Sequence, residues 1–262
     1  MRNKHIVVTG ATGNLGSKVA TALLENHQPI VVTGRNEEKL AAFTGKAKLL
    51  TGNLEDSRFL QELLQDAAAV FLVLPNLNQL SIKGFAEQLI SIAEASGVTH
   101  VVNISNCTLT RFGKPTSLIE FETYLNEAEQ LHIKHLRCAN FFENLNWGIH
   151  TPYHPDIKLP YISSFEIART AARYLQEQNF TGHTVDELMG VADYSMSEIA
   201  TQLGVTYQQV PARAEDQAFF DAFNSGQYEL VKRTLANTSV AQDERFTLSY
   251  FLEHDFNREL LK

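Results

Sequence analysis

The stretch that decides the fold is Gly10-Ala11-Thr12-Gly13-Asn14-Leu15-Gly16, a glycine-rich turn between a short apolar run and a helical pattern. The run Ile6–Thr9 leads directly into Gly10, and apolar residues recur at helical spacing after Gly16. Three glycines suit a tight turn, a close approach of backbone N–H groups to a diphosphate, and close packing of helix on strand. A structural turn without a ligand is the alternative. The pattern favours a dinucleotide-binding turn whose contacts come from Gly10, Thr12, Gly13, Asn14, Leu15 and Gly16.

Short β-branched runs alternate with helical patterns through the first half of the chain. Several runs are continuously apolar, as expected for strands of a parallel sheet that is covered on both faces. The clearest helical pattern is Phe85–Ala95, with Gly97 as its stop signal. The alternation predicts an α/β doubly wound parallel sheet, the Rossmann fold. Its expected strands are Ile6–Thr9, Ile30–Thr33, Lys48–Thr51, Val70–Leu74, Val98–Ile104 and Ile133–Cys138.

The strand–helix rhythm ends near Phe141. Residues 141–160 are rich in Asn, His and Pro and show no clear period, and a helical pattern returns at Phe165–Gln176. We therefore expect a dinucleotide-binding domain over residues 1–145. A small mixed α/β C-terminal lobe for substrate or partner is expected over 146–262, with a chain that can cross between the two lobes.

Composition bounds the partners and the compartment. The chain has 262 residues, of which 44% are hydrophobic, and a net charge of −8. This charge argues against direct nucleic-acid binding and against an anionic membrane surface. No apolar run approaches the roughly 20 residues that a membrane span needs. Two cysteines do not make a disulfide framework, so a cytoplasmic protein is expected.

The end of the second expected strand bears on the choice of cofactor. Sites that prefer NAD usually carry an acidic residue there, whereas this chain reads Thr33-Gly34-Arg35-Asn36. The guanidinium of Arg35 can hold a 2′-phosphate or stack on adenine, and Lys39 can add a second positive charge. Arg35 as a solvated strand-end residue is the alternative. The strand end thus favours NADP(H) over NAD(H), with Arg35, Asn36 and Lys39 as cofactor contacts.

Segments at the carboxyl ends of later strands are further candidates, because open α/β sheets bind ligands at that edge. Asn53 and Leu54 are expected to flank the adenine. The run Leu74-Pro75-Asn76 is expected to pass the ribose and diphosphate, and Ser105 to face the nicotinamide.

Several stretches resemble one known family. They are the glycine turn, Gly34-Arg35-Asn36, Gly52-Asn53-Leu54, Val70-Phe71-Leu72-Val73, Gly97-Val98-Thr99-His100-Val101-Val102, Arg137-Cys138-Ala139-Asn140-Phe141-Phe142-Glu143-Asn144, Phe165-Glu166-Ile167-Ala168 and Leu188-Met189-Gly190. Together they look like the NmrA-like group of atypical short-chain dehydrogenases. The resemblance implies a Rossmann domain that binds NADP(H), with a small lobe over the nicotinamide. Some members resemble NADPH-dependent quinone or aldehyde reductases, and others are cofactor-sensing regulators that bind a protein partner.

The expected Rossmann domain over 1–145 lacks the catalytic pair of ordinary short-chain dehydrogenases. A Tyr-x-x-x-Lys spacing occurs only at Tyr228-Glu229-Leu230-Val231-Lys232, in the expected C-terminal lobe. Many NmrA-like members carry Lys or His four residues before the Glu of a Glu-x-Tyr-Leu segment. Here that Glu is Glu122, and the equivalent position holds Leu118, which transfers no proton. The remaining polar candidates near the expected nicotinamide are Ser105, Asn106 and Asn140, each of which is alternatively a capping or turn residue.

The aromatic segment after this point is a candidate substrate wall. Phe141, Phe142, Asn144 and Trp147 are proposed to contact an aromatic substrate, with burial in a hinge between lobes as the alternative. No metal site is expected, because His132, His135 and Cys138 cannot converge from one strand.

Two functions follow from these patterns. The first is an NADPH-dependent oxidoreductase that acts on a small quinone-like or carbonyl electrophile, because the cofactor carries the hard chemistry. The second is a non-catalytic NADP(H) redox sensor that binds a regulatory protein partner. A homodimer is compatible with either.

Overall fold

A seven-stranded sheet forms the centre of the fold, with the strand order β11-β8-β5-β4-β1-β2-β3. The neighbours β1 and β2, β1 and β4, β2 and β3, and β4 and β5 pair in parallel. Its strands are β1 (His5–Val8), β2 (Ile30–Gly34), β3 (Lys48–Thr51), β4 (Ala67–Val73), β5 (His100–Asn106), β8 (His132–Cys138) and β11 (His183–Leu188). The predicted doubly wound α/β fold is confirmed. The structure is a computed structural model that describes residues 4–240 and 242–261.

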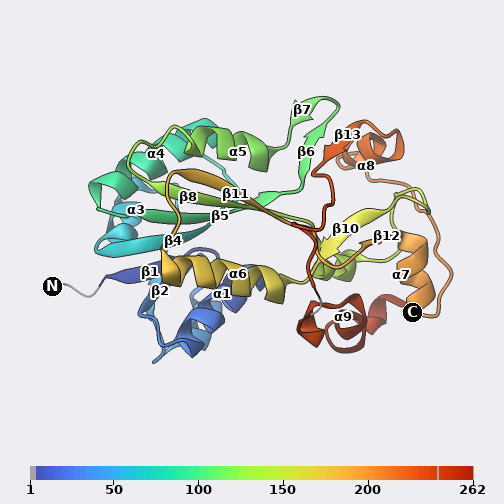
Figure 1. The fold of residues 1–262 in the computed structure, drawn as a ribbon, viewed down its shortest axis with the longest axis horizontal. Coiled ribbons are helices and arrows are strands. Elements are labelled where there is room, and N and C mark those ends of the chain that lie inside the picture. The colour runs from blue at the N-terminus through green and yellow to red at the C-terminus, as the bar shows by residue number, and fades with distance from the viewer. Residues whose placement is uncertain (1–3, 241, 262) are drawn as a thin grey trace. The chain divides into compact units, whose positions relative to one another are not determined.

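Helices cover both faces of this sheet (Figure 1). One face carries α3 (Ser57–Leu64), α4 (Ile82–Ala95) and α5 (Ser117–Leu125), and the other carries α1 (Asn14–Glu25) and α6 (Ser164–Glu177). Val7, Val31 and Val70 contribute to the core under α3, α4 and α5, while their neighbours Val8 and Phe71 are fully buried as well. Burial on both faces explains why these strands read as continuous apolar runs.

The glycine turn connects β1 to α1 in a single tight loop. Gly10 has φ +63°, and the N–H of Gly13 donates to its carbonyl over 2.9 Å. The N–H of Ala11 donates to Thr33 O over 3.0 Å, which ties the turn to β2. A Cβ at Gly16 would lie 2.3 Å from Gly10 O. Any side chain at position 16 would therefore force α1 away from the turn.

Two expected strand starts are wrong: the strand expected from Val70 begins earlier, at Ala67, and the one expected from Val98 begins later, for a local reason. We expected a strand from Val98, but β5 begins at His100. Gly97 has φ +74°, and the N–H of Val98 donates back to Ala93 O over 3.0 Å. Val98 therefore belongs to the C-terminal turn of α4, in the manner of a Schellman motif. Apolar character alone cannot separate this turn from the strand that follows.

The described chain divides into two compact units that alternate along the sequence. Unit 1 holds the residues up to Ser105 together with Ser117–Leu136 and Ile167–Asp186, and it also contains α2 (Glu37–Leu40) and η1 (Ala41–Phe43). Unit 2 holds Asn106–Thr116, Arg137–Glu166 and the residues from Glu187 onward.

Unit 2 contains two small sheets and several short helices. One sheet has the order β12-β10-β9, from β9 (Asn140–Phe141), β10 (Leu159–Ile162) and β12 (Asp193–Tyr194). The other has the order β13-β6-β7, from β6 (Thr108–Arg111), β7 (Lys114–Pro115) and β13 (Tyr228–Leu230). The helices are η2 (Phe142–Trp147), α7 (Met196–Gln202), α8 (Gln217–Asn224), η3 (Glu244–Phe246), α9 (Leu248–His254) and η4 (Arg258–Leu261).

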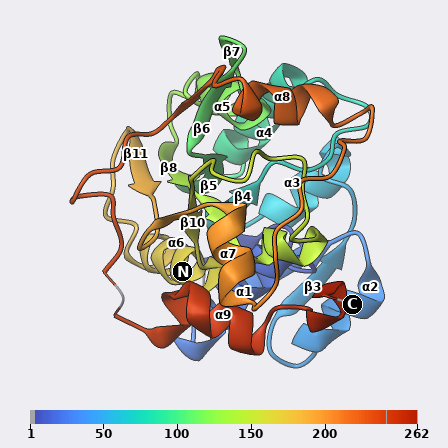
Figure 2. The same cartoon turned by 90° about the vertical axis from the view of Figure 1, so that its right-hand side faces the viewer.

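The core of unit 2 is built around aromatic rings. Phe142 stacks on Tyr161 and on Phe251, with ring centroids 6.3 and 5.9 Å apart. α7 and α9 lie side by side in both ribbon views and contribute Ile199 and Leu252 to the same core (Figure 2). Unit 2 thus has a hydrophobic core of its own.

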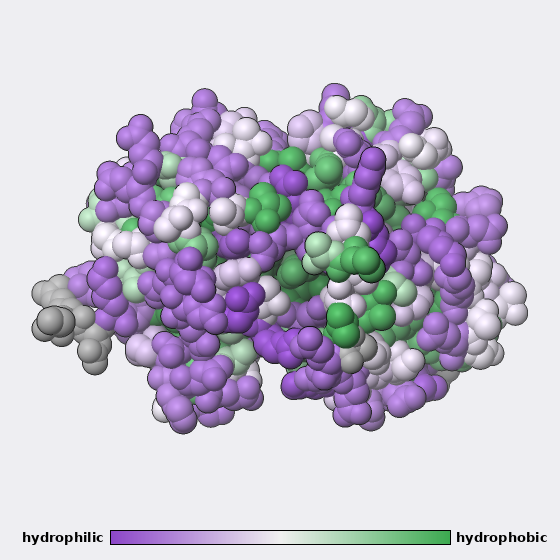
Figure 3. Space-filling view, in the orientation of Figure 1, coloured by the Kyte–Doolittle hydropathy of each residue, from purple (hydrophilic) through white to green (hydrophobic). Residues whose placement is uncertain are grey.

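The surface of the molecule is more hydrophilic than the two hydrophobic cores. Hydrophilic residues predominate on the face in Figure 3, and hydrophobic residues gather there in small groups. The strongly exposed hydrophobic side chains include Trp147 and Leu235 in unit 2. No helix in residues 4–240 and 242–261 combines the length and the apolar character that a membrane crossing requires.

The close approach of Gly16 to the Gly10 carbonyl predicts that two glycine-to-alanine substitutions change the free energy of unfolding in opposite directions. Gly16→Ala should lower the free energy of unfolding by about 2 kcal/mol, because the new methyl group meets the Gly10 carbonyl. The control is Gly84→Ala in α4, where the nearest atom lies 3.4 Å from the Cβ position. This change should raise the free energy of unfolding by about 0.5–1 kcal/mol. Urea denaturation measures both; equal effects would contradict the packing described.

Candidate functional site

The N-terminus of α1 presents backbone N–H groups that have no protein acceptor. Its N-cap is Gly13, which supplies no side-chain cap, and no acidic residue lies in the first turn. Within residues 4–240 and 242–261, the N–H groups of Asn14, Leu15 and Gly16 donate no hydrogen bond. Unpaired donors and the positive end of a helix dipole together attract an anion. The structure thus places the predicted turn residues where they can hold a diphosphate.

The carboxyl end of β2 lies against this turn. A Cβ at Gly34 would be 2.7 Å from Thr12 Cγ2, so the side chain of Thr12 packs directly on the backbone of Gly34. Arg35 follows immediately, is exposed, and makes no ion pair within the described residues. The side chain of Asn36 accepts a hydrogen bond from the N–H of Lys39 over 2.9 Å and caps α2. The side chains of Arg35 and Lys39 are therefore two cations that lie in solvent near Thr12.

A groove of about 1210 Å³ runs from the turn along α1. Thr12 and Lys39 line it toward the turn, and α1 lines it with Ser17, Thr21 and Leu24. The opposite side comes from Ala42, Phe43 and Lys46, beyond the single turn of α2. The short α2 leaves this part of unit 1 open to solvent.

The segments after β3 and β4 are joined by a buried carboxylate. Oε1 of Glu55 accepts hydrogen bonds from the N–H groups of Gln79 and Leu80, over 2.7 and 2.9 Å. Both carboxylate oxygens accept from the N–H of Asn78 over 3.1 Å. These backbone hydrogen bonds, led by that of Leu80, hold the pKa of Glu55 below its usual range. Glu55 is only 5% exposed.

The predicted contacts Asn53 and Leu54 directly precede this carboxylate. Asn53 Oδ1 accepts from the N–H of Glu55 over 3.2 Å, and Leu54 packs against the core of unit 1. Leu74 also packs on that core, whereas Asn76 is exposed. Leu74-Pro75-Asn76 begins the irregular segment that ends at the residues held by Glu55. The hydrogen bonds between Glu55 and residues 78–80 thus connect the two predicted loops, and none of the predicted contact residues takes part in them.

Ser105 lies at the end of β5, in unit 1. It is 3% exposed, and its Oγ has no hydrogen-bond partner among the described residues. A buried hydroxyl without a partner is costly, which is consistent with a site that a ligand completes. Its roles as cofactor contact and catalytic residue stay predictions.

Leu118 occupies the first turn of α5 and is partly buried. Tyr124, on the same helix, packs on the core of unit 1 and donates a hydrogen bond to Glu120 over 3.4 Å. α5 therefore offers no proton donor at position 118, and the phenol of Tyr124 is used within its own helix.

The other two catalytic candidates belong to unit 2. Asn106 Oδ1 accepts from the N–H of Thr108 over 2.8 Å, which is a turn-forming role. Asn140 lies on β9 and donates from Nδ2 to Pro160 O over 3.3 Å. Asn140 also lines a cavity in this unit, whereas Asn106 does not belong to its lining.

This cavity has a volume of about 560 Å³ and aromatic walls. Asn144 and Trp147 line it, and Trp147 is 85% exposed. Phe142 is 2% exposed and lies in the core, and Phe141 pairs with Ile162 in the small sheet. The other ring-bearing lining residues are Tyr153, Tyr161, His150, Phe219 and Phe220.

The lining of the cavity offers both hydrogen-bond donors and acceptors. Burial raises the pKa of Tyr153 and of Tyr161 further above neutral, so both phenols stay protonated. His150 Nδ1 accepts from the N–H of Gln208 over 3.2 Å, which places the proton of the neutral ring on Nε2. Arg213 adds a guanidinium and Asp216 a carboxylate at the lining. This set suits a flat ring that carries carbonyl oxygens.

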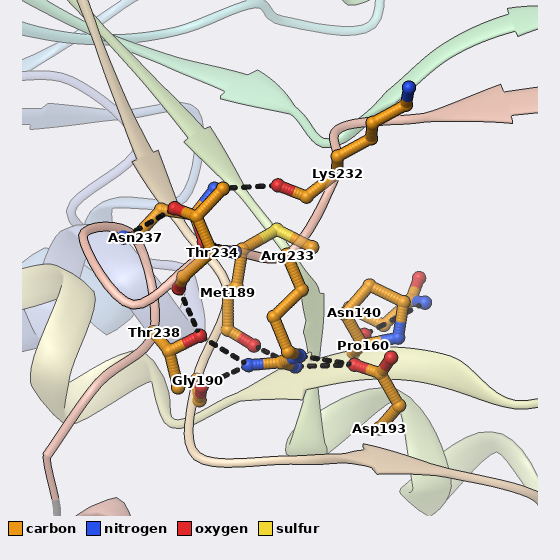
Figure 4. Close-up of polar contacts among 10 residues, drawn as sticks. All are labelled: Asn140, Pro160, Met189, Gly190, Asp193, Lys232, Arg233, Thr234, Asn237 and Thr238. Atoms are coloured by element: carbon orange, nitrogen blue, oxygen red, sulfur yellow. Dashed lines mark hydrogen bonds and ion pairs between the residues drawn. The ribbon is translucent and has the colours of Figure 1, made fainter.

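A hydrogen-bonded cluster around Arg233 supports the small sheet that carries Asn140 (Figure 4). Its guanidinium donates to Gly190 O over 2.7 Å and Met189 O over 2.9 Å, and pairs with Asp193. Asp193 lies opposite Pro160 in the β10–β12 pair. The cluster thus anchors the strand whose Pro160 carbonyl accepts from Asn140.

Metal-ligating residues do not gather in the part of the chain that the structure describes, where no group of three or more suitable side chains is found. His132 Nδ1 accepts from the N–H of Gly182, while His135 bonds Asn103 and Asn126, both over 3.0 Å. These histidines therefore serve different contacts in unit 1.

Sequence reasoning missed Glu55 and the aromatic residues from 153 onward. The neighbours of Glu55 in the sequence are Leu54, Asp56 and Ser57. They show no periodicity from which a buried acid could be told apart from an exposed one. The only signal is its place directly after a strand, at the ligand-binding edge. Tyr153 and Phe219 are far apart in sequence, and only tertiary structure brings them together.

A family model described as NAD(P)H-binding matches residues 10–152, more than half of the chain. The chain therefore belongs to this NAD(P)H-binding family. No curated protein sequence matches it.

Solved structures share the fold at low sequence identity. The NADPH-dependent quinone oxidoreductase QOR2 from Escherichia coli, complexed with NADPH, has 22% identity and a TM-score of 0.76, over 96% of this chain and 100% of that chain. NmrA, a negative transcriptional regulator in complex with NAD, has 15% identity and a TM-score of 0.75, over 99% and 98%. A Citrobacter sp. triphenylmethane reductase complexed with NADP(H) has 18% identity and a TM-score of 0.74, over 89% and 93%. The predicted resemblance to the NmrA-like group is confirmed in the fold and in the NAD(P)H-binding domain.

Proposed function

We propose that this protein is an NADPH-dependent oxidoreductase that reduces a small quinone-like or carbonyl electrophile. The observation that carries the proposal is the uncapped N-terminus of α1 above the glycine turn. Its unpaired N–H groups form an anion site, and membership of the NAD(P)H-binding family gives that anion its chemical class.

The phosphorylated cofactor is favoured by the charges at the end of β2. Arg35 and Lys39 are exposed, and the chain carries no acid at the strand tip to bind the ribose hydroxyls. A guanidinium matches a phosphate through two parallel hydrogen bonds. Arg35 would thus bind the 2′-phosphate, and Lys39 would add a point charge beside it.

The cavity of unit 2 supports the substrate class. Its aromatic walls suit a flat ring, and donors such as His150 Nε2–H suit carbonyl oxygens. When bound, NADPH supplies a hydride, and one proton from solvent completes the conversion of a quinone to its hydroquinone, leaving NADP⁺. Residues of the cavity would bind and orient the ring, and this reaction requires no protein acid.

A second candidate is a non-catalytic NADP(H) sensor that binds a regulatory protein. It is favoured by Leu118, which cannot transfer a proton, and by the helical packing of Tyr124. One structure with the same fold is named as a negative transcriptional regulator in complex with NADP. Under this proposal the affinities for NADPH and NADP⁺ differ, so the redox ratio sets the amount of partner-competent protein.

Substitution of Arg35 tests the cofactor preference. Arg35→Ala should weaken NADPH binding about 10-fold to 100-fold through loss of a charge-assisted contact, while NADH binding changes little. Arg58→Ala is the control, since Arg58 is an exposed arginine on α3 of the same unit. Calorimetric titration measures all four affinities. Similar losses for NADPH and NADH would show that Arg35 does not read the phosphate.

Turnover distinguishes the two functions. Wild-type protein should oxidise NADPH when it is given benzoquinones, naphthoquinones or small aromatic aldehydes, measured as loss of the reduced nicotinamide absorbance. Absence of turnover across the whole panel, despite cofactor binding, would contradict the reductase proposal. Unequal affinities for NADPH and NADP⁺ in such an inactive protein would instead support the sensor.

A further inference from the structure

The carboxylate of Glu55 links two segments that follow different strands. Glu55 stands in the segment after β3, and its hydrogen-bond donors, Asn78 to Leu80, stand in the segment between β4 and α4. In the sheet order, β3 lies at one edge, and β1 and β2 separate it from β4. The link therefore spans the carboxyl ends of the strands that carry the glycine turn and Arg35.

The geometry of the link suits an ionised side chain. Carboxylate oxygens only accept hydrogen bonds, so three successive backbone N–H groups can converge on one group without a mismatch. An amide side chain of the same shape would place an NH₂ group where Asn78 N–H donates to Oε2, so two donors would face each other there. The Asn78 N–H would keep only its contact with Oε1, and the loss of the negative charge would weaken all three hydrogen bonds.

Further contacts hold the same region. Gln88 of α4 donates from Nε2 to the carbonyls of Leu54 and Glu55, over 3.4 and 3.2 Å. Leu80 packs on the core of unit 1, and Ser81 caps α4 by accepting from the N–H of Gly84. The irregular segment 74–80 is thus fixed at its end by Glu55 and by the start of α4.

We infer that Glu55 is a positioning residue for the dinucleotide. It acts by holding the segments 52–54 and 74–80 at the separation that receives the adenine half of the cofactor. The inference rests on the cofactor site proposed above, and it adds a residue that contacts no ligand itself. Glu55 reaches the cofactor only through the backbone of the two segments.

The test compares Glu55→Gln with Glu62→Gln. Glu62 is an exposed residue of α3, and its substitution removes the same single negative charge. Calorimetric titration with NADP⁺ should give a dissociation constant about tenfold higher for Glu55→Gln and an unchanged one for Glu62→Gln. Wild-type affinity in the Glu55→Gln variant would overturn the inference. Because the titration needs no turnover, a protein that binds NADP⁺ but reduces nothing would contradict the reductase proposal alone.

Amide hydrogen exchange in the unliganded variants separates positioning from a general loss of stability. In Glu55→Gln, the amides of residues 78–80 should exchange faster, while those of β1 and β2 keep their wild-type rates. Faster exchange at 78–80 with unchanged NADP⁺ affinity would show that the link is structural only, and would overturn the inference.

Should Glu55→Gln fail to fold, Glu55→Asp provides the same test. It keeps the charge but withdraws the carboxylate by one methylene, so it should weaken NADP⁺ binding less than tenfold but measurably. Wild-type affinity together with faster exchange at residues 78–80 in this variant would also overturn the inference.

Discussion

The constraint on which the rest of unit 1 depends lies at the start of α1, where the first backbone N–H groups are left unsatisfied. A helix that begins at Asn14 without a side-chain cap leaves these donors without an acceptor among the residues that the structure describes. They stay close to the end of β1 only because Gly16 has no side chain to meet the Gly10 carbonyl. The strand, the turn and the helix therefore leave N–H donors that can bind an anion from outside the protein.

The surrounding elements are consistent with this arrangement. Gly34 packs against Thr12 and brings Arg35 to the same edge of the sheet, where the charge of a phosphate would meet a free guanidinium. Glu55 joins the segments after β3 and β4 with a carboxylate in place of flexible loop contacts. Each of these contacts joins residues of unit 1. The cavity in unit 2 is an independent element, built from its own aromatic core.

The parts of the fold that could be predicted are those with a local signature. The glycine turn, the strand Lys48–Thr51 and the helix that ends at Ala95 follow from residue type and period, because these local properties decide the backbone conformation. The start of β5 was wrong because Val98 is apolar both as a strand residue and as part of a helix C-terminal turn. Glu55 was not found at all, since its burial depends on three N–H groups more than twenty residues away. Asn144 and Trp147 were named in advance among the residues that line the cavity, but its other walls were missed for the same reason as Glu55: Tyr153 and Phe219 are neighbours only in the folded unit.

The central claim is that α1 binds the diphosphate of a nicotinamide dinucleotide through its first N–H groups. A crystal structure of the protein with NADP⁺ tests it most directly. We expect diphosphate oxygens within about 3 Å of the backbone nitrogens of Asn14 or Leu15, where N–H donors reach charged oxygens. A dinucleotide bound elsewhere, or a glycine turn that keeps only solvent at a saturating cofactor concentration, would contradict the account.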